Sequence, residues 1–375
     1  MQGKDTSWSD DERIRYSRHF VLPGFGAEGQ LKLRNSSVIV VGAGGLGAPV
    51  LSYLAAAGIG TLGIADADVV SLSNLQRQIL FTTSDIGRGK ADCAKARING
   101  INPATHVNVV PLHITSSNAL DILRDYDVVV DATDNFPTRY LLNDACILLN
   151  KPLVYGSIFR YEGQVSVFNH AGGPNYRDLY PIPPNPGSVP DCEAGGVLGV
   201  LPGIIGSIQA NEVIKLLTGI GNLLSGKLLL LDSLTMESNI IALPKKQNHS
   251  IKSLIDYDQF CGLKTKKENS MKEITVSELK AMKDSKEDFQ LIDVREPHEY
   301  ETCNLDGELI PMADLPAQVD QISKTKKVII HCRSGSRSGN MVQWLEKNHG
   351  FTNLYNLKGG ILAWAKEIDQ SMPTY

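Results

Sequence analysis

The sequence VIVVGAGGLG at residues 38–47 decides the fold of the first part of the chain. Four apolar residues in a row are typical of a strand buried on both faces of a parallel sheet, and the glycines that follow allow a sharp turn. Residues 48–57 continue as an apolar helix, and Gly58 is placed as its C-terminal cap. A second strand at 61–65 then ends at Asp66. These are the parts of a nucleotide-binding βαβ unit.

Each glycine of the turn has an expected role. Gly42 allows the strand to turn, Gly44 and Gly45 let the backbone approach a phosphate, and Gly47 lets the helix pack on the strand. The start of the helix then offers free N–H groups and its dipole to an anion. Asp66 would accept hydrogen bonds from ribose hydroxyls. A dinucleotide dehydrogenase fits these residues as well, and the alternative to any ligand is a glycine turn that only packs.

The residues further along favour a triphosphate. Three polar or cationic side chains follow the second strand and would neutralise phosphate charge: Asn74, Arg77 and Lys90. Another buried strand at 127–131 is followed by Asp134 and Asn135. Doubly wound sheets place ligand groups in the loop at this end of a strand, and a carboxylate beside phosphates is a reasonable Mg²⁺ ligand.

Together these motifs resemble the MoeB/ThiF adenylyltransferases, bacterial relatives of the ubiquitin-activating enzymes. The resemblance runs from about residue 13 to 232, on RYSR at 15–18, the glycine turn, DAD at 66–68, SLSNLQRQ at 71–78, Lys90 and DATDN at 131–135. It implies an ATP site in which Asp66 holds the ribose and Asp134 binds Mg²⁺. The phosphate contacts that it implies come from Asn74, Arg77 and Lys90.

The resemblance also implies a homodimer in which Arg18 reaches into the site of the partner subunit. The residues alone favour a solvated surface charge as the explanation of Arg18. The segment 174–190 holds six prolines and is predicted to be a long irregular loop. Cys192 follows it and resembles the family's cysteine above the adenylation site, which has a covalent or resolving role. A small residue at a helix start is the alternative reading of Cys192.

The chain departs from the family in one respect. The family commonly carries two Cys-x-x-Cys pairs that bind a structural zinc, whereas this chain has NYRD at 175–178 and DQFC at 258–261. Of the four thiolates only Cys261 remains, and Asn is a poor ligand for tetrahedral Zn²⁺. We therefore expect no zinc site.

A smaller α/β pattern begins after the polar stretch 264–270, which has the composition of a linker. Strands are predicted at 290–294 and 327–332, with helices after Gly339 and after Gly360. The predicted fold is α/β: a Rossmann-like doubly wound sheet with an antiparallel extension, followed by this smaller domain. The predicted boundaries are 1–245 for the first domain, 246–271 for the linker and 272–375 for the second domain.

The chemistry of the second domain centres on CRSGSR at 332–337. Cys332 ends an apolar strand, and the loop amides, the following helix start and two arginines would favour an anion at sulfur. A phosphatase loop is the nearest alternative, but four residues between Cys332 and Arg337 make a tighter cradle. With DVRE at 293–296 and LKGGILAW at 357–364, the segment resembles a rhodanese domain.

That resemblance implies that Cys332 carries the transferred sulfur as a persulfide. It implies that Asp293 and Arg295 brace the fold rather than react. The loop residues expected around the persulfide are Arg333, Ser334, Gly335, Ser336 and Arg337.

Composition excludes several classes of function. The chain has 375 residues, 42% of them apolar and 21% charged, and a formal net charge of −4, which leaves no basic footprint for nucleic acid or membranes. The apolar stretch 197–208 is interrupted by Pro202 and glycines and is too short to span a bilayer. Scattered cysteines and a polar start predict reduced thiols and a cytoplasmic location.

The predicted function joins the two domains. The first would adenylate the C-terminal Gly-Gly carboxylate of a ubiquitin-like sulfur carrier protein with MgATP. The Cys332 persulfide would then displace AMP, and reductive cleavage with Cys192 would leave a thiocarboxylate. The expected sulfur donor is a protein such as a cysteine desulfurase, and molybdopterin, thiamine, tRNA thiolation and specialised sulfur metabolism all use this chemistry. The alternatives are an NAD(P) or flavin oxidoreductase with an appended rhodanese unit, a non-catalytic carrier-binding scaffold, and adenylation of a small molecule or of tRNA.

Overall fold

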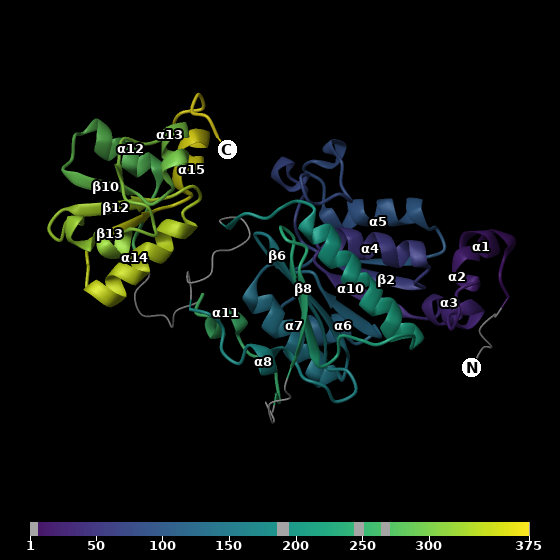
Figure 1. Ribbon diagram of the computed structural model, residues 1–375. Helices are drawn as coiled ribbons and strands as arrows, with labels where there is room; N and C mark the ends of the chain where they lie inside the picture. The colour runs from purple at the N-terminus through teal and green to yellow at the C-terminus, as the bar shows by residue number, and fades with distance from the viewer. Residues whose placement is uncertain (1–6, 186–194, 244–250, 264–270, 375) are drawn as a thin grey trace. The chain divides into compact units, whose positions relative to one another are not determined.

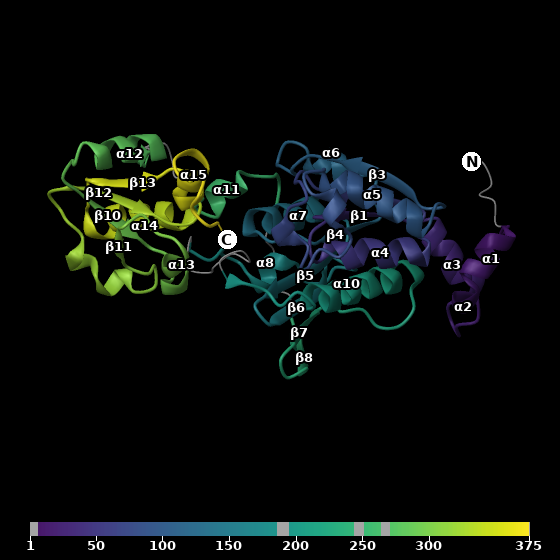
Figure 2. The same ribbon diagram turned by 90° about the horizontal axis from the view of Figure 1, so that it is seen from above.

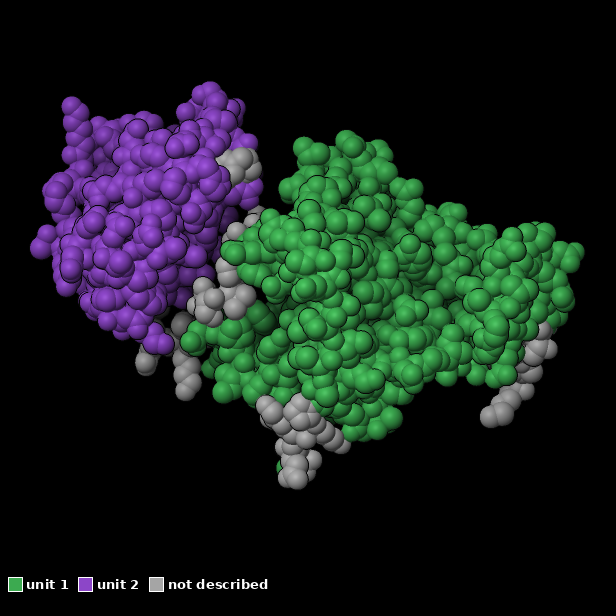
Figure 3. All heavy atoms as spheres, viewed as in Figure 1, with its two compact units in different colours: residues 1–185, 189–264 green, residues 186–188, 265–375 purple. Residues whose placement is uncertain are grey.

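The chain forms two compact units, which are shown separately coloured in Figure 3. The computed structural model describes residues 7–185, 195–243, 251–263 and 271–374. The described residues up to 263 belong to the first unit and those from 271 onward to the second. Cys192 lies outside the described residues, as do residues 246–250 and 264–270 of the predicted linker. The division of activities between residues 1–245 and 272–375, with a linker at 246–271, stays a prediction.

An eight-stranded sheet forms the centre of the first unit (Figure 1). Its strand order is β3-β2-β1-β4-β5-β6-β7-β8; the first five strands run parallel and the last three antiparallel. The strands are β1 (Ser37–Val41), β2 (Thr61–Ala65), β3 (His106–Val110), β4 (Val128–Asp131), β5 (Leu153–Phe159), β6 (Glu162–Phe168), β7 (Lys227–Asp232) and β8 (Ser238–Ala242). The predicted doubly wound sheet with an antiparallel extension is confirmed.

Each face of this sheet has its own apolar core, because successive side chains of a strand point to opposite faces. Val38 and Val40 of β1 belong to the core that also takes in the helices of one face, whereas Ile39 and Val41 belong to the other core. The first face carries α4 (Gly47–Ala57), α5 (Lys90–Ile101) and α10 (Leu201–Thr218), of which α4 and α10 lie side by side (Figures 1 and 2). The second carries α6 (Ala119–Leu123) and α7 (Phe136–Leu149).

Short helices complete the first unit. On the second face, α8 (Tyr176–Leu179) and α11 (Tyr257–Phe260) pack against α7, so part of the predicted linker belongs to this core. Near the N-terminus lie α1 (Asp10–Arg15), α2 (Ser17–Phe20) and α3 (Gly26–Arg34). Ser9 caps α1, since its hydroxyl accepts from the Glu12 amide. Among the described helices, none combines the length and the apolar character that a membrane span requires.

A hairpin around residues 160 and 161 joins β5 to β6. The helix α10 that follows begins only at Leu201. The reason is a bridge to the hairpin: the Arg160 amide donates to the Gly196 carbonyl at 3.2 Å, and the Leu198 amide donates to the Arg160 carbonyl at 3.0 Å. These backbone bonds hold residues 196–198 extended and delay the helix.

The second unit is built on a five-stranded parallel sheet with the order β11-β10-β12-β13-β9. Its strands are β9 (Glu273–Ile274), β10 (Phe289–Asp293), β11 (Glu308–Leu309), β12 (Lys327–His331) and β13 (Leu354–Leu357). Its helices are α12 (Val276–Asp284), α13 (Pro297–Thr302), α14 (Ser336–His349) and α15 (Gly360–Glu367). The core on one face includes α14, and the core on the other includes α12 and α15. The helix predicted after Gly339 begins at Ser336, about one turn earlier.

Candidate functional sites

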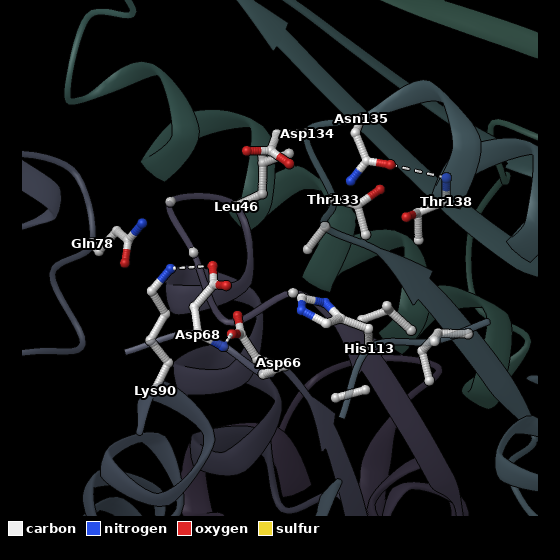
Figure 4. A pocket seen from close by; sticks show the side chains of 18 of the residues that line it. Leu46, Asp66, Asp68, Gln78, Lys90, His113, Thr133, Asp134, Asn135 and Thr138 are labelled. Carbon is white, nitrogen blue, oxygen red and sulfur yellow. Dashed lines mark hydrogen bonds and ion pairs between the residues drawn. The ribbon is translucent and has the colours of Figure 1, made fainter. Parts of the chain in front are cut away.

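A pocket of about 300 Å³ opens at the carboxyl ends of β1, β2 and β4 (Figure 4). Eight of the residues predicted from the sequence line it: Gly42, Gly44, Gly45, Asp66, Arg77, Lys90, Asp134 and Asn135. Figure 4 shows Asp66, Asp68 and Lys90 on one side of the pocket and Asp134 with Asn135 on the other. The volume is at the lower end of the range usual for small-molecule sites.

Two glycines of the turn are required by close contacts. Gly42 has φ of +96°, and a Cβ there would lie 2.6 Å from the Ala132 carbonyl oxygen. A Cβ at Gly47 would lie 1.9 Å from the Gly42 carbonyl oxygen, so Gly47 serves the packing of α4 on β1 and is not among the described residues that line the pocket. Gly44 faces the pocket with only the Gln78 amide nearby, which leaves its backbone accessible to a ligand.

Asp66 is held by backbone amides. Its Oδ2 accepts from the Ala43 amide at 2.7 Å, and its Oδ1 accepts from the Asp68 amide at 2.8 Å. Burial raises the pKa of Asp66, while these two hydrogen bonds and the charge of Lys90 act in the opposite direction. The carboxylate is therefore fixed in orientation at the end of β2, with lone pairs left for a ligand hydroxyl.

Lys90, the first residue of α5, already has an anionic partner. Its Nζ lies 2.9 Å from Oδ2 of Asp68. The lysine side chain is 8% exposed and the aspartate side chain 59%, so the pair sits at the edge of the pocket. An entering phosphate would compete with Asp68 for a charge that is already in position.

Arg77 and Asn74 take different places. Arg77 lines the pocket, and its Nη1 donates to the Ser73 carbonyl at 3.0 Å. The side chain of Asn74 instead caps its own 3₁₀ turn, Leu72–Asn74, by accepting from the Ser71 amide at 3.2 Å. Among the described residues, Asn74 is not one that lines the pocket, and neither is Arg18, which is exposed on α2.

Side-chain hydrogen bonds fix the conformation of the loop after β4. Oδ1 of the buried Asp131 accepts from the Thr133 amide at 2.9 Å and from its hydroxyl at 2.6 Å. Arg139 donates through Nη2 to the Thr133 carbonyl at 3.0 Å. Asn135 Oδ1 accepts from the Thr138 amide at 3.0 Å and so caps α7 (Figure 4). Asp134 is thus presented to the pocket by a braced turn, whereas the side-chain oxygen of Asn135 is already used.

Several residues that line the pocket were not predicted from the sequence: Asp68, Gln78, Thr133, His113 and Arg139. Asp68 could have been found from its spacing, because it follows β2 by three residues. His113 follows β3, a strand that was not predicted, and Figure 4 shows its ring pointing into the pocket. Arg139 lies inside α7 and carried no local signal.

In the second unit, Cys332 lies directly after β12 and is fully buried. The Gly335 amide donates to its Sγ at 3.2 Å, and α14 begins at the next residue. The loop is closed on the other side by α15, since the Ile361 amide donates to the Cys332 carbonyl at 2.9 Å. A helix N-terminus and a loop amide thus face the sulfur.

The guanidinium of Arg337 forms an ion pair with a carboxylate, so its charge does not act on the sulfur alone. Its Nη1 and Nη2 each lie 2.7 Å from the carboxylate of Glu299 on α13, a bidentate ion pair. The prediction that two arginines favour an anion at sulfur therefore needs correcting for Arg337, because Glu299 neutralises much of its charge. Asp293 and Arg295 brace the fold as expected: both are fully buried, and Nη2 of Arg295 lies 2.6 Å from Oδ2 of Asp293.

The positions of the family's zinc pairs are occupied by a different arrangement. Arg177 on α8 donates through Nε and Nη2 to the two oxygens of Asp144 on α7, at 2.8 and 2.7 Å. The Tyr257 hydroxyl of α11 donates to the same carboxylate at 2.7 Å. The guanidinium carbon lies 5.0 Å from the ring centre of Tyr140 and 4.6 Å from that of Phe260. We call Asp144, Arg177 and Tyr257 the clamp.

The clamp does not fit a zinc ion. Its centre is a guanidinium cation, and the remaining thiol, Cys261, is buried with a pKa raised to about 11 by burial and then by Asp258. Within the described ranges, no cluster of three or more His, Cys, Asp or Glu side chains could hold a metal.

Comparison with known protein families identifies a match for each of the two units. Residues 16–253 match the ThiF family, and residues 275–367 match the rhodanese-like domain. Among curated relatives, the probable adenylyltransferase/sulfurtransferase MoeZ of Mycobacterium tuberculosis is 45% identical, over 98% of this chain and 96% of the relative. The adenylyltransferase and sulfurtransferase MOCS3 of Culex quinquefasciatus is 42% identical, over 99% of this chain and 91% of the relative.

Solved structures share the fold of the first unit. A crystal structure of MccB from E. coli aligns with a TM-score of 0.58 at 21% identity, covering 67% of this chain and 75% of MccB. A structure of PaaA aligns with a TM-score of 0.55 at 23% identity, covering 66% of this chain and 78% of PaaA.

Proposed function

Because this chain belongs to the ThiF family and carries a rhodanese-like domain after it, we propose that the chain is an adenylyltransferase and sulfurtransferase that converts a carrier protein's C-terminal carboxylate into a thiocarboxylate. The observation that carries the proposal is the pocket at the carboxyl ends of β1, β2 and β4. It combines accessible glycine backbone, a fixed carboxylate at Asp66, the cations Arg77 and Lys90, and a second carboxylate at Asp134. These groups suit the ribose and the charged phosphates of a nucleoside triphosphate.

The residues of the pocket would divide the work. Asp66, held by two amides, would accept from the ribose hydroxyls, and the start of α4 would face the phosphates. Lys90 and Arg77 would balance the charge that develops on the leaving pyrophosphate. Asp134 fits a Mg²⁺ ion. Proteins usually bind magnesium through one or two carboxylates, and the phosphate oxygens of the substrate provide further ligands. Bound there, the metal would supply charge neutralisation at the phosphates.

The first reaction would be acyl adenylation. An oxygen of the carrier's terminal carboxylate attacks the α-phosphorus, a new carboxylate–phosphorus bond forms, and the bond to the β-phosphate oxygen breaks. Pyrophosphate leaves, and the carrier holds AMP as a mixed anhydride. Positioning and charge stabilisation account for such a reaction, since no group of the protein has to form a covalent bond.

The second reaction would transfer sulfur. The terminal sulfur of the Cys332 persulfide attacks the acyl carbon, and AMP leaves with the electron pair of the broken carbon–oxygen bond. The acyl disulfide that results is then cleaved by a thiolate, for which we propose Cys192. The carrier leaves as the thiocarboxylate, and Cys192 and Cys332 are left as a disulfide that an external thiol must reduce. We propose a cysteine desulfurase as the source of the persulfide sulfur.

Two further parts of the proposal concern assembly. We propose a homodimer in which the exposed Arg18 completes the pocket of the partner subunit. We also propose that zinc is absent and that the clamp holds α8 and α11 on α7 without a metal.

The test is pyrophosphate exchange into ATP, measured with a carrier protein that ends in Gly-Gly. Asp134→Ala should lose the exchange and thiocarboxylate formation. Cys332→Ala should keep the exchange and lose only the thiocarboxylate, which is measured by intact mass. Thiocarboxylate formation by Cys332→Ala with a persulfide donor present would overturn the two-unit relay. Absence of carrier-dependent exchange in the wild-type chain would leave a carrier-binding scaffold instead.

A further inference from the structure

The sulfur of Cys332 has a second polar neighbour, which lies just beyond the loop 332–337. Ser338, in the first turn of α14, is fully buried, and its Oγ lies 3.4 Å from Sγ of Cys332. The same Oγ lies 2.7 Å from Oδ1 of Asn356 on β13. Nδ2 of Asn356 lies 3.5 Å from Oε1 of Glu273 on β9, so the amide group is oriented with its oxygen toward Ser338. A chain of polar groups therefore runs from an exposed carboxylate to the buried sulfur.

Ser338 has one hydroxyl proton and two possible acceptors. The distance to Asn356 is that of a good O–H···O bond, so in the thiol state the proton lies toward Asn356. A lone pair of Oγ then faces the sulfur and can accept the S–H proton. The arrangement is satisfied as long as Cys332 is neutral.

A negative charge on the sulfur reverses this preference. A thiolate at Sγ would face an oxygen lone pair, and a small rotation of the hydroxyl replaces that repulsion with an O–H···S bond. Hydrogen bonds to ionised groups are about twice as strong as neutral ones. The anion would then have two donors, the Gly335 amide and the Ser338 hydroxyl, and Asn356 would lose its donor.

We propose that Ser338 is a positioning residue that stabilises the anionic sulfur of Cys332, and that Asn356 competes with the sulfur for the Ser338 hydroxyl. The inference rests on the proposed function in one respect, that Cys332 carries the transferred sulfur. Ser338 touches the sulfur through its hydroxyl and takes no part in bond making.

Other charged groups surround the loop and stay unchanged in the test. His331 and Arg333 are neighbours along the chain, Arg337 of α14 is paired with Glu299 of α13, and Glu273 stands behind Asn356. Replacing Ser338 by alanine alters none of them. Any change in the titration of Cys332 therefore reports the hydroxyl.

The experiment uses the full chain with its cysteine β-carbons labelled with carbon-13. The signal of Cys332 is assigned by its absence in Cys332→Ala, and its chemical shift is followed against pH. Ser338→Ala should move the titration midpoint upward by about one pH unit, the equivalent of one charge-assisted hydrogen bond partly offset by the bond to Asn356. Ser338→Thr, which keeps a hydroxyl, should restore the wild-type midpoint.

Asn356→Leu gives the opposite prediction. It removes the competing acceptor, so the hydroxyl is free for the sulfur and the midpoint should move downward. The matched control is Ser285→Ala, which removes a serine hydroxyl bonded to the Met282 carbonyl at the end of α12. That control should leave the midpoint unchanged.

Two results would overturn the proposal. One is an unchanged midpoint in Ser338→Ala; the other is movement in the same direction in Ser338→Ala and Asn356→Leu, which would indicate a general loosening of the loop. The titration needs neither ATP nor a carrier. If the midpoints move as expected and no thiocarboxylate forms, the proposed function fails while the role of Ser338 stands.

Discussion

Replacing Arg177 by methionine should destabilise the first unit far more than its place on a four-residue helix suggests. The Arg177 and Asp144 side chains are 8% and 2% exposed, and they are joined by two hydrogen bonds of 2.8 and 2.7 Å. Removing one partner of such a pair leaves a buried charge without compensation, which costs about 3–5 kcal/mol.

The chain offers a matched control for the role of burial. Arg124 and Asp121 form a pair with the same 2.7 Å contact, but their side chains are 58% and 77% exposed. Arg124→Met should therefore cost at most about 1 kcal/mol. The double variant Asp144→Asn with Arg177→Met should be more stable than Arg177→Met alone, because the buried charge is gone while Tyr257 keeps an acceptor.

The rate at which Cys261 reacts with a thiol reagent measures the opening of α8 and α11. Cys261 is buried beside the clamp, and its pKa is raised to about 11 by burial, so the closed state reacts slowly with thiol reagents. Labelling by iodoacetamide, followed peptide by peptide with mass spectrometry, reports opening of α8 and α11. A loss of 3–5 kcal/mol corresponds to labelling that is about 10² to 4 × 10³ times faster.

The reasoning is refuted if Arg177→Met labels Cys261 no faster than Arg124→Met does. It is also refuted if the purified chain contains one zinc per protomer and a chelator accelerates the labelling. Zinc well below one equivalent, with labelling unaffected by chelator, is the expected result.

Lys90→Met should lower pyrophosphate exchange by at least about 100-fold, because a preorganised cation is lost, whereas Lys95→Met on the exposed side of the same helix should have little effect. Burial lowers the pKa of His331 to about 4, so the unfolded chain binds a proton there between about pH 6.5 and 4 that the folded chain does not bind. The second unit should therefore lose up to about 3 kcal/mol of stability as the pH falls through this window, and His331→Asn should flatten the loss, measured by urea-dependent hydrogen exchange of β12. If Arg18 acts in the partner's site, mixing and re-equilibrating inactive Arg18→Ala and Asp134→Ala chains should restore about a quarter of the wild-type exchange through mixed dimers; no recovery would contradict that role.

The central strands of the fold were predictable from the sequence because burial on both faces removes all ambiguity. Val38 to Val41 lie between two helical layers and contain only apolar residues, so no polar side needs to be recognised. The edge strands are different. β3 alternates buried and exposed residues, and every residue of β8 is exposed, so neither carries the pattern of a buried strand. Their existence depends on the neighbouring strands with which they pair.

The residues of the pocket were also predictable only in part. Motif spacing brought Asp66, Lys90 and Asp134 to one place because the carboxyl ends of parallel strands meet at one edge. It did not reveal which polar partner each side chain would choose. Arg337 bonds to Glu299, which lies 38 positions away and comes close only in the folded chain. Asn74 bonds to Ser71 within its own turn, three positions away.

The clamp marks the limit of sequence reasoning most clearly. The missing thiols led to the prediction that zinc is absent, which stays a prediction, but they did not indicate what holds α8 and α11 in place. Asp144 lies 33 positions from Arg177 and 113 positions from Tyr257, so no local pattern connects them.

The clamp also has a chemical consequence for a protein that handles sulfane sulfur. Zinc–thiolate clusters are nucleophilic, and persulfides and oxidants convert their ligands to disulfides and release the metal. An arginine, an aspartate and a tyrosine offer nothing to such reagents, and the neighbouring Cys261 is kept as a buried thiol. The architecture of the first unit is thereby insulated from the cargo of the second. On the proposal that zinc is absent, assembly of the first unit requires no metal.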